Sequence, residues 1–88
     1  MSTLPGGFSP YTCTISDEAK LAFDQATNRI FGVRYLPVAV SQQVVSGMVY
    51  KFFCNTQTVT LRPLLGSAIV TIYAPLRANA YITHIQTL

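Results

Sequence analysis

The chain has 88 residues, the size of one small domain. Half of the residues are hydrophobic and only 10% are charged, against about 25% in a typical soluble domain. This composition excludes intrinsic disorder, which requires low hydrophobicity and many charges. The net charge of +3 comes from six basic residues that are scattered with no two adjacent, so we expect no nucleic-acid partner.

The first residues of the chain do not resemble a targeting segment. Met1 to Gly7 has neither the basic region nor the apolar region of a signal peptide. No apolar run approaches the roughly 20 residues of a spanning helix, so we expect no membrane partner. Two cysteines, Cys13 and Cys54, are too few for a disulfide scaffold, although the sequence leaves one bridge open. These features predict a cytoplasmic protein with reduced thiols.

Residues 1–14 predict an extended amino-terminal arm. The run Leu4-Pro5-Gly6-Gly7-Phe8-Ser9-Pro10 combines two prolines, which fix φ, with two glycines, which carry no local preference. A helix cannot form in this stretch.

Residues 16–31 carry the only helical pattern. Ser16 or Thr14 can cap its amino terminus, and Asp17–Glu18 fall in the first turn, where the helix dipole favours negative charge. Gly32 follows the pattern as a typical stop signal. Small and apolar residues at helical spacing form one narrow stripe that predicts close packing on a sheet. The stripe consists of Ala19, Ala22, Phe23, Ala26 and Ile30.

Residues 33–88 indicate β-structure throughout. The expected strands are 33–40, 48–54, 67–73 and 80–86, with 58–61 as an extension of the second strand. Pro37 predicts an edge position or a bulge in the first strand. Because short links join consecutive strands, we expect an antiparallel meander. The expected fold class is therefore α+β, with one amino-terminal helix packed on a four- to five-stranded antiparallel sheet in a single domain, 1–88.

Residues with catalytic chemistry are few. The single histidine, His84, could in principle pair with Cys13 or Cys54 as a nucleophile and base, but a half-exposed histidine and two packing cysteines are the preferred interpretation. All three carboxylates lie on the helix, where a solvated face explains them. Neither a Cys-x-x-Cys pair nor a glycine-rich phosphate loop occurs. We expect no enzyme, no metal ion and no cofactor.

Three segments carry apolar residues where connections are usually polar. They are Leu4-Pro5-Gly6-Gly7-Phe8, Gln42-Gln43-Val44-Val45-Ser46-Gly47 and Ala74-Pro75-Leu76. In a meander the first and third hairpins turn at the same end of the sheet, and the arm can reach that end. Clustered apolar tips usually mark a binding surface, so the sequence predicts a wedge made of three segments.

The second of these segments resembles the signature of a known family. Gln43-Val44-Val45-Ser46-Gly47 fits the Gln-x-Val-x-Gly loop of the cystatins, a match that arises by chance in about one chain in sixty of this length. Its place between the first two strands after a single helix is also the family's. The opening Leu4 to Ser9 resembles the trunk of stefins, the intracellular branch without disulfides, and Pro75-Leu76 falls where stefins carry Leu-Pro, in reversed order.

The resemblance implies a cystatin-like fold and reversible, competitive inhibition of papain-like cysteine proteases of the cathepsin type. The arm and the two hairpin loops would enter the protease cleft together. The residues implied in binding are Leu4, Pro5, Gly6, Gly7, Gln43, Val44, Val45, Ser46, Gly47, Pro75 and Leu76. Gly47 would occupy a turn position with φ > 0. The alternative is a non-inhibitory interaction module with the same fold.

Two features depart from the family pattern. The third segment lacks tryptophan, and the stretch from Thr56 to Ser67 has no clear counterpart. The target protease stays open for these reasons. The scarcity of charge in the β half, where Ser67 to Leu88 holds only Arg77, leaves strand edges with few charged residues. We therefore expect a monomer that is liable to dimerise by strand exchange, as stefin-like proteins do through the first loop.

Overall fold

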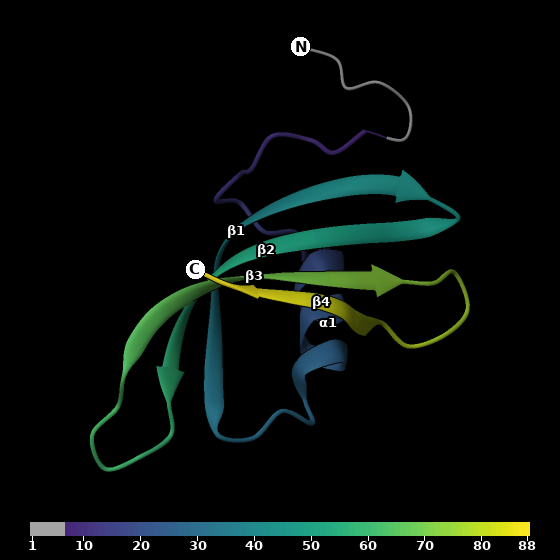
Figure 1. Ribbon diagram of the computed structural model, residues 1–88. Coiled ribbons are helices and arrows are strands. Elements are labelled where there is room, and N and C mark those ends of the chain that lie inside the picture. Colours follow the sequence, from purple (N-terminus) through teal and green to yellow (C-terminus); the bar gives the residue numbers. More distant parts are fainter. Residues whose placement is uncertain (1–6) are drawn as a thin grey trace.

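The computed structural model describes residues 7–88. This part of the chain forms one helix and four strands: α1 (Asp17–Thr27), β1 (Val33–Val45), β2 (Gly47–Thr58), β3 (Leu65–Ala74) and β4 (Tyr81–Thr87). The strands pair antiparallel in the order β1-β2-β3-β4, and α1 lies across one face of the sheet (Figure 1). The expected α+β arrangement, one helix on an antiparallel meander, is confirmed.

The helix begins where the sequence predicts but ends earlier. Ser16, not Thr14, is the N-cap, and its Oγ accepts a hydrogen bond from the Ala19 amide at 3.2 Å. The helix stops at Thr27, with Asn28 as the C-cap, so the predicted end at residue 31 is wrong by about one turn. No basic side chain stabilises the last turn. Within residues 7–88, no helix is long and apolar enough to cross a membrane.

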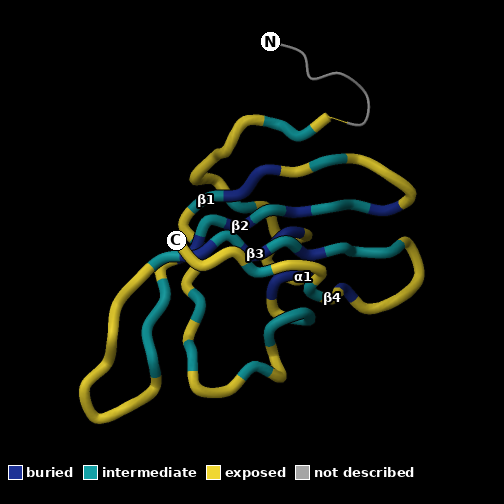
Figure 2. The backbone as a smooth tube through the Cα atoms, in the orientation of Figure 1, coloured by how far each residue is buried: buried dark blue, intermediate teal, exposed yellow. Residues whose placement is uncertain are grey.

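The core lies between α1 and one face of the sheet. Ala19 and Ala22 let the helix approach the strands closely, and the Phe23 ring meets the Phe52 ring edge-on with 4.9 Å between centroids. Buried residues of the strands alternate along β2 and β3 toward this face, which Figure 2 shows as dark segments. The residues with the least exposed side chains are Phe52, Cys54, Val70 and Ile72.

The β1–β2 hairpin is longer than the sequence predicts. Residues 42–45, assigned above to a loop, continue β1, and Gly47 opens β2, so Ser46 alone separates the paired residues Val45 and Gly47. Strand pairing continues through residues 42–45 because none of these residue types disfavours an extended backbone. Pro37 lies on the edge strand and beside a register shift between Pro37 and Ala39, so both expectations for it are confirmed.

The amino-terminal arm follows the outer edge of β1. The Ser9 amide donates to the Gln42 carbonyl at 2.8 Å, and Thr12 and Val40 exchange two backbone hydrogen bonds of 2.9 Å. The arm therefore adds a short, fifth antiparallel segment to the sheet, within the four- to five-stranded range expected. It also covers part of an edge that would otherwise be open to other strands.

A substitution in the core should lower the stability of the protein much more than a substitution on the exposed side of α1. Ile72→Ala should lower the free energy of unfolding by about 2–5 kcal/mol, because Ile72 is fully buried and its loss leaves a cavity. Leu21→Ala, on the exposed side of α1, should change it by less than about 0.5 kcal/mol. Urea unfolding followed by circular dichroism measures both values. Equal losses in the two variants would contradict this core.

Candidate functional site

The tips of the β1–β2 and β3–β4 hairpins lie at the same end of the sheet, as the meander predicts (Figure 1). We call the residues exposed or lining the surface there the tip surface. It consists of Val44, Val45, Ser46, Gly47, Pro75 and Leu76. Val44 is 66% exposed and Leu76 is 77% exposed, so two hairpins present apolar side chains to solvent at one place. The structure thus brings together the second and third segments that the sequence singled out.

A direct contact holds the two tips against each other. The Tyr73 hydroxyl, on β3, donates a short hydrogen bond to the Ser46 carbonyl at the turn of the first hairpin. Gly47 adopts φ +106°, which confirms the expected left-handed turn position. A Cβ on Gly47 would overlap the Ala74 carbonyl oxygen and lie 3.2 Å from the Pro75 Cα. Only glycine permits both the turn and this close approach of the second tip.

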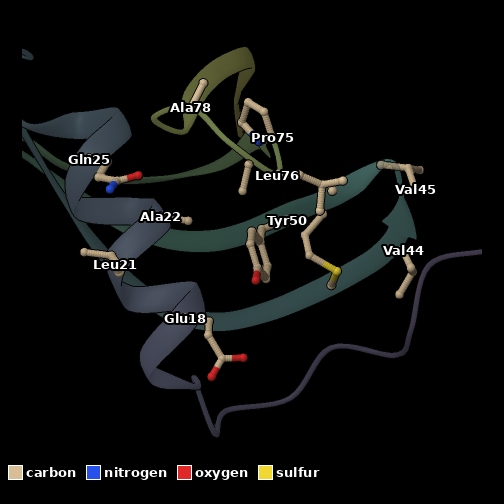
Figure 3. Close-up of a pocket in the computed structure, with 13 residues that line it drawn as sticks. Glu18, Leu21, Ala22, Gln25, Val44, Val45, Tyr50, Pro75, Leu76 and Ala78 are labelled. Carbon is tan, nitrogen blue, oxygen red and sulfur yellow. The ribbon is translucent and has the colours of Figure 1, made fainter.

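A pocket of about 500 Å³ lies between the tip surface and α1 (Figure 3). Most of its lining is apolar and comes from the helix, from β2 and from the β3–β4 connection. Burial, and then the negative charge of Glu18, raises the pKa of the Tyr50 hydroxyl, so this phenol stays neutral well into the alkaline range. Gln25 Oε1 accepts a hydrogen bond from the Ala80 amide at 3.0 Å and thereby ties the helix to the start of β4.

The arm approaches the tip surface along β1. The arm runs antiparallel to β1, with Ser9 opposite Gln42 and Thr12 opposite Val40. Ser9 is therefore nearer than Thr12 to the turn of the β1–β2 hairpin. Phe8 places its ring 4.3 Å from Lys51 Nζ, a cation–π contact on the face of the sheet away from α1. Gly7 is exposed. Leu4, Pro5 and Gly6 lie outside the described residues.

The cysteine and histidine side chains do not converge. Both cysteines are free, with Cys13 exposed on the arm and Cys54 buried in the core, where burial raises the pKa of its thiol to about 12. His84 pairs with Thr71, on the face of the sheet opposite to that of Cys54. The arm and β4 occupy opposite edges of the sheet, several strand spacings of about 4.8 Å apart. This placement does not support a cysteine–histidine dyad.

Comparison of the chain with models of known protein families, with curated proteins and with solved structures finds no match. The resemblance to cystatins therefore rests on the Gln43 to Gly47 motif and its place in the fold, together with the Leu4 to Ser9 and Pro75-Leu76 segments of the sequence.

Two features of the site were not anticipated from the sequence. One is the Tyr73–Ser46 hydrogen bond, which depends on the register between β2 and β3. The other is the pocket behind the tips. The sequence did contain one indication of the pocket. Leu21 is an apolar residue outside the helix stripe, and its side chain lines the pocket.

Gly47 should be the most sensitive glycine of the hairpins. Gly47→Ala should lower the free energy of unfolding by about 1–3 kcal/mol from backbone strain alone, with a further loss from overlap with Ala74. Gly66→Ala is the matched control, because its Cβ would meet only the Thr56 hydroxyl, at 3.1 Å, and should lose less than about 1 kcal/mol. Urea unfolding compares them. A Gly47 variant as stable as the Gly66 variant would contradict the close approach.

The two thiols should differ sharply in reactivity. With iodoacetamide at pH 8.5 the native protein should take up one label, at exposed Cys13, because Cys54 is inaccessible and remains protonated below its pKa of about 12. In guanidinium chloride both thiols should react. Intact-mass spectrometry counts the labels, and rapid double labelling of the folded protein would be inconsistent with a buried Cys54.

Proposed function

We propose that this protein is a stefin-like, reversible and competitive inhibitor of papain-like cysteine proteases of the cathepsin type. The observation that carries the proposal is the docking of the Gln43 to Gly47 hairpin on the Ala74–Leu76 connection, which joins two apolar tips into one protruding surface. The amino-terminal arm, through Leu4, Pro5, Gly6 and Gly7, is the third part of the proposed wedge.

The chemistry of the tips suits insertion into an apolar cleft. Residues 42–50 and 73–76 contain no charged side chain, so no charge has to be desolvated on binding. Burying Val44, Val45 and Leu76 contributes roughly 1.5–3 kcal/mol each before the cost of association. Because the two tips are already docked on each other, little conformational freedom is lost on binding. Affinity tighter than micromolar is expected on these grounds.

The tight hairpin also explains why such a loop would block a protease without being cleaved. A substrate segment binds to a protease in an extended form, whereas Val45 and Gly47 are paired across a single residue, Ser46. Cleavage would require the end of the β1–β2 ladder and the Tyr73–Ser46 contact to open first.

The proposal also covers the cellular compartment and the oligomeric state of the protein. Two free cysteines suit a reducing compartment such as the cytoplasm. Inhibition by occlusion needs neither a cofactor nor a metal ion. Among residues 7–88, the backbone hydrogen bonds of the arm to β1 are at Val40 and Gln42, and no strand pairs with the outer side of β4. Exchange of strands between copies therefore belongs to the proposal as a route from monomer to dimer.

Inhibition of papain by the purified protein tests the proposal. The parent chain should inhibit competitively below micromolar concentration, and Val44→Asp should weaken inhibition at least tenfold, since a carboxylate would have to be desolvated in the cleft. Leu65→Asp is the matched control: it places the same charge on an exposed residue at the other end of the sheet and should inhibit like the parent. Steady-state kinetics gives the inhibition constants.

Failure to inhibit papain or a cathepsin at micromolar concentration, with the fold retained, would exclude the inhibitor and favour the non-inhibitory interaction module. Equal weakening by the Val44 and Leu65 substitutions would exclude the tip surface as the binding surface. Unfolding curves of all three proteins serve as the check on folding.

A further inference from the structure

The end of the molecule opposite to the tip surface carries a second, larger set of exposed apolar residues. They lie on the connection between α1 and β1, on the connection between β2 and β3, and at the start of β3 (Figure 1). We call this set, together with the arginines beside it, the distal surface. It consists of Phe31, Val59, Leu61, Leu64 and Leu65 with Arg34 and Arg62. The proposed inhibition makes no use of it.

Backbone hydrogen bonds bring the two connections together. The Val59 amide donates to the Gly32 carbonyl at 2.9 Å, and Val33 pairs with Thr58 at the end of the β1–β2 ladder. The β2–β3 connection is closed at its base, where the Leu64 amide donates to Thr58 Oγ1 at 2.7 Å. The leucines are therefore displayed on a defined loop whose neighbour is the segment that carries Phe31.

The apolar side chains of the distal surface pack on little of their own chain. Leu61 is 102% exposed, Phe31 is 89% exposed and Leu65 is 80% exposed, more than Leu76, Val44 or Val45 of the tip surface. Figure 2 shows the β2–β3 connection as an exposed segment that projects from the sheet. Exposed apolar groups clustered in this way usually mark a surface that is covered in the functional state.

The charge of the distal surface is of one sign. Arg34 and Arg62 are here, while residues 28–36 and 57–66 contain no carboxylate, because all three acidic residues lie on α1. A hollow of about 200 Å³ at the base of the loop is lined in part by Arg34, Thr60 and Pro63, which offers a guanidinium and a hydroxyl to a phosphate group.

We propose that the distal surface binds the surface of bilayers that contain anionic phospholipids. Leucine and phenylalanine side chains at protruding tips would enter the boundary between headgroups and acyl chains, and the arginines around them would pair with lipid phosphates. We expected no membrane partner because the sequence has no apolar run long enough to span a bilayer, but binding to the bilayer surface needs no such run. The fold places Arg34 and Arg62 beside exposed apolar tips.

The shape and side-chain types of the distal surface favour lipid over other partners. Its apolar residues protrude from loops, whereas a docking site for a peptide or helix is a groove with apolar walls. Four of the five apolar residues are aliphatic and cannot stack on nucleic-acid bases. In the proposed orientation the tip surface points away from the bilayer and remains open to a protease, and neither proposal depends on the other.

Vesicle flotation tests the proposal with the full chain. Vesicles of phosphatidylcholine with 30% phosphatidylserine should bind the protein at least tenfold more tightly than pure phosphatidylcholine vesicles at 50 mM salt, and 500 mM salt should weaken binding strongly (roughly, each arginine near an anionic surface contributes a severalfold factor). Leu61→Ser combined with Leu64→Ser should lower binding at least tenfold without unfolding the protein, since both side chains are exposed.

Leu76→Ser is the matched control, because it removes an equally exposed leucine from the other end and should bind vesicles like the parent. No binding to anionic vesicles, equal binding to neutral vesicles, or no effect of the double substitution would each overturn the proposal. A dimer that depends on Leu61 in sedimentation velocity, or binding to single-stranded nucleic acid, in either case without vesicle binding, would assign the distal surface to another partner and would also overturn it.

Discussion

A single short helix has to cover a sheet that is much longer than the helix, and this constraint shapes the whole molecule. The 11 residues of α1 span about 17 Å, whereas the 13 residues of β1, which curves along the sheet, have a path length of about 43 Å (Figure 1). The helix therefore buries only the middle of one face, through Phe23 and its alanines on Phe52 and Ile72. Both ends of the sheet extend beyond it, and both carry exposed apolar residues.

The two ends solve this problem differently. At the tip surface the two hairpins dock on each other, because Gly47 accepts a backbone conformation and an approach to Ala74 that a side chain would prevent. The result is an uncharged surface that fits an apolar cleft. At the distal surface a backbone hydrogen bond from Val59 to Gly32 joins the two connections, and their exposed leucines and Phe31 lie beside arginines. The same geometric constraint thus produces two exposed apolar surfaces, one that we propose for a protease and one that we propose for an anionic bilayer.

Local sequence patterns were sufficient for the type and order of the elements and for one feature of the site, but not for the strand bounds, since β2 continues unbroken to Thr58 and the expected extension at 58–61 is not a strand beyond Thr58. The edge position of Pro37, the positive φ of Gly47 and the cap at Ser16, one of two candidates, follow from residue types and spacing, and the structure has all three. The helix stripe is confirmed from Ala19 to Ala26, but Ile30, which was also assigned to it, lies beyond the end of α1. The end of α1 did not follow, because a stop at Thr27 depends on where the chain must turn toward β1. The gathering of Phe31 with Leu61 and Leu64 was also beyond local patterns, since strand register and the Val59–Gly32 hydrogen bond determine it.

Hydrogen exchange of the protein with and without papain tests the central claim, that the tip surface is the surface that binds a protease. We predict that the amides of Val44 to Gly47 and of Leu76 exchange more slowly in the complex than in the free protein. The exchange rates of the amides from Leu61 to Leu65 should be the same in both. Protection confined to the distal loop, or no protection at either hairpin tip in a complex that forms, would contradict it.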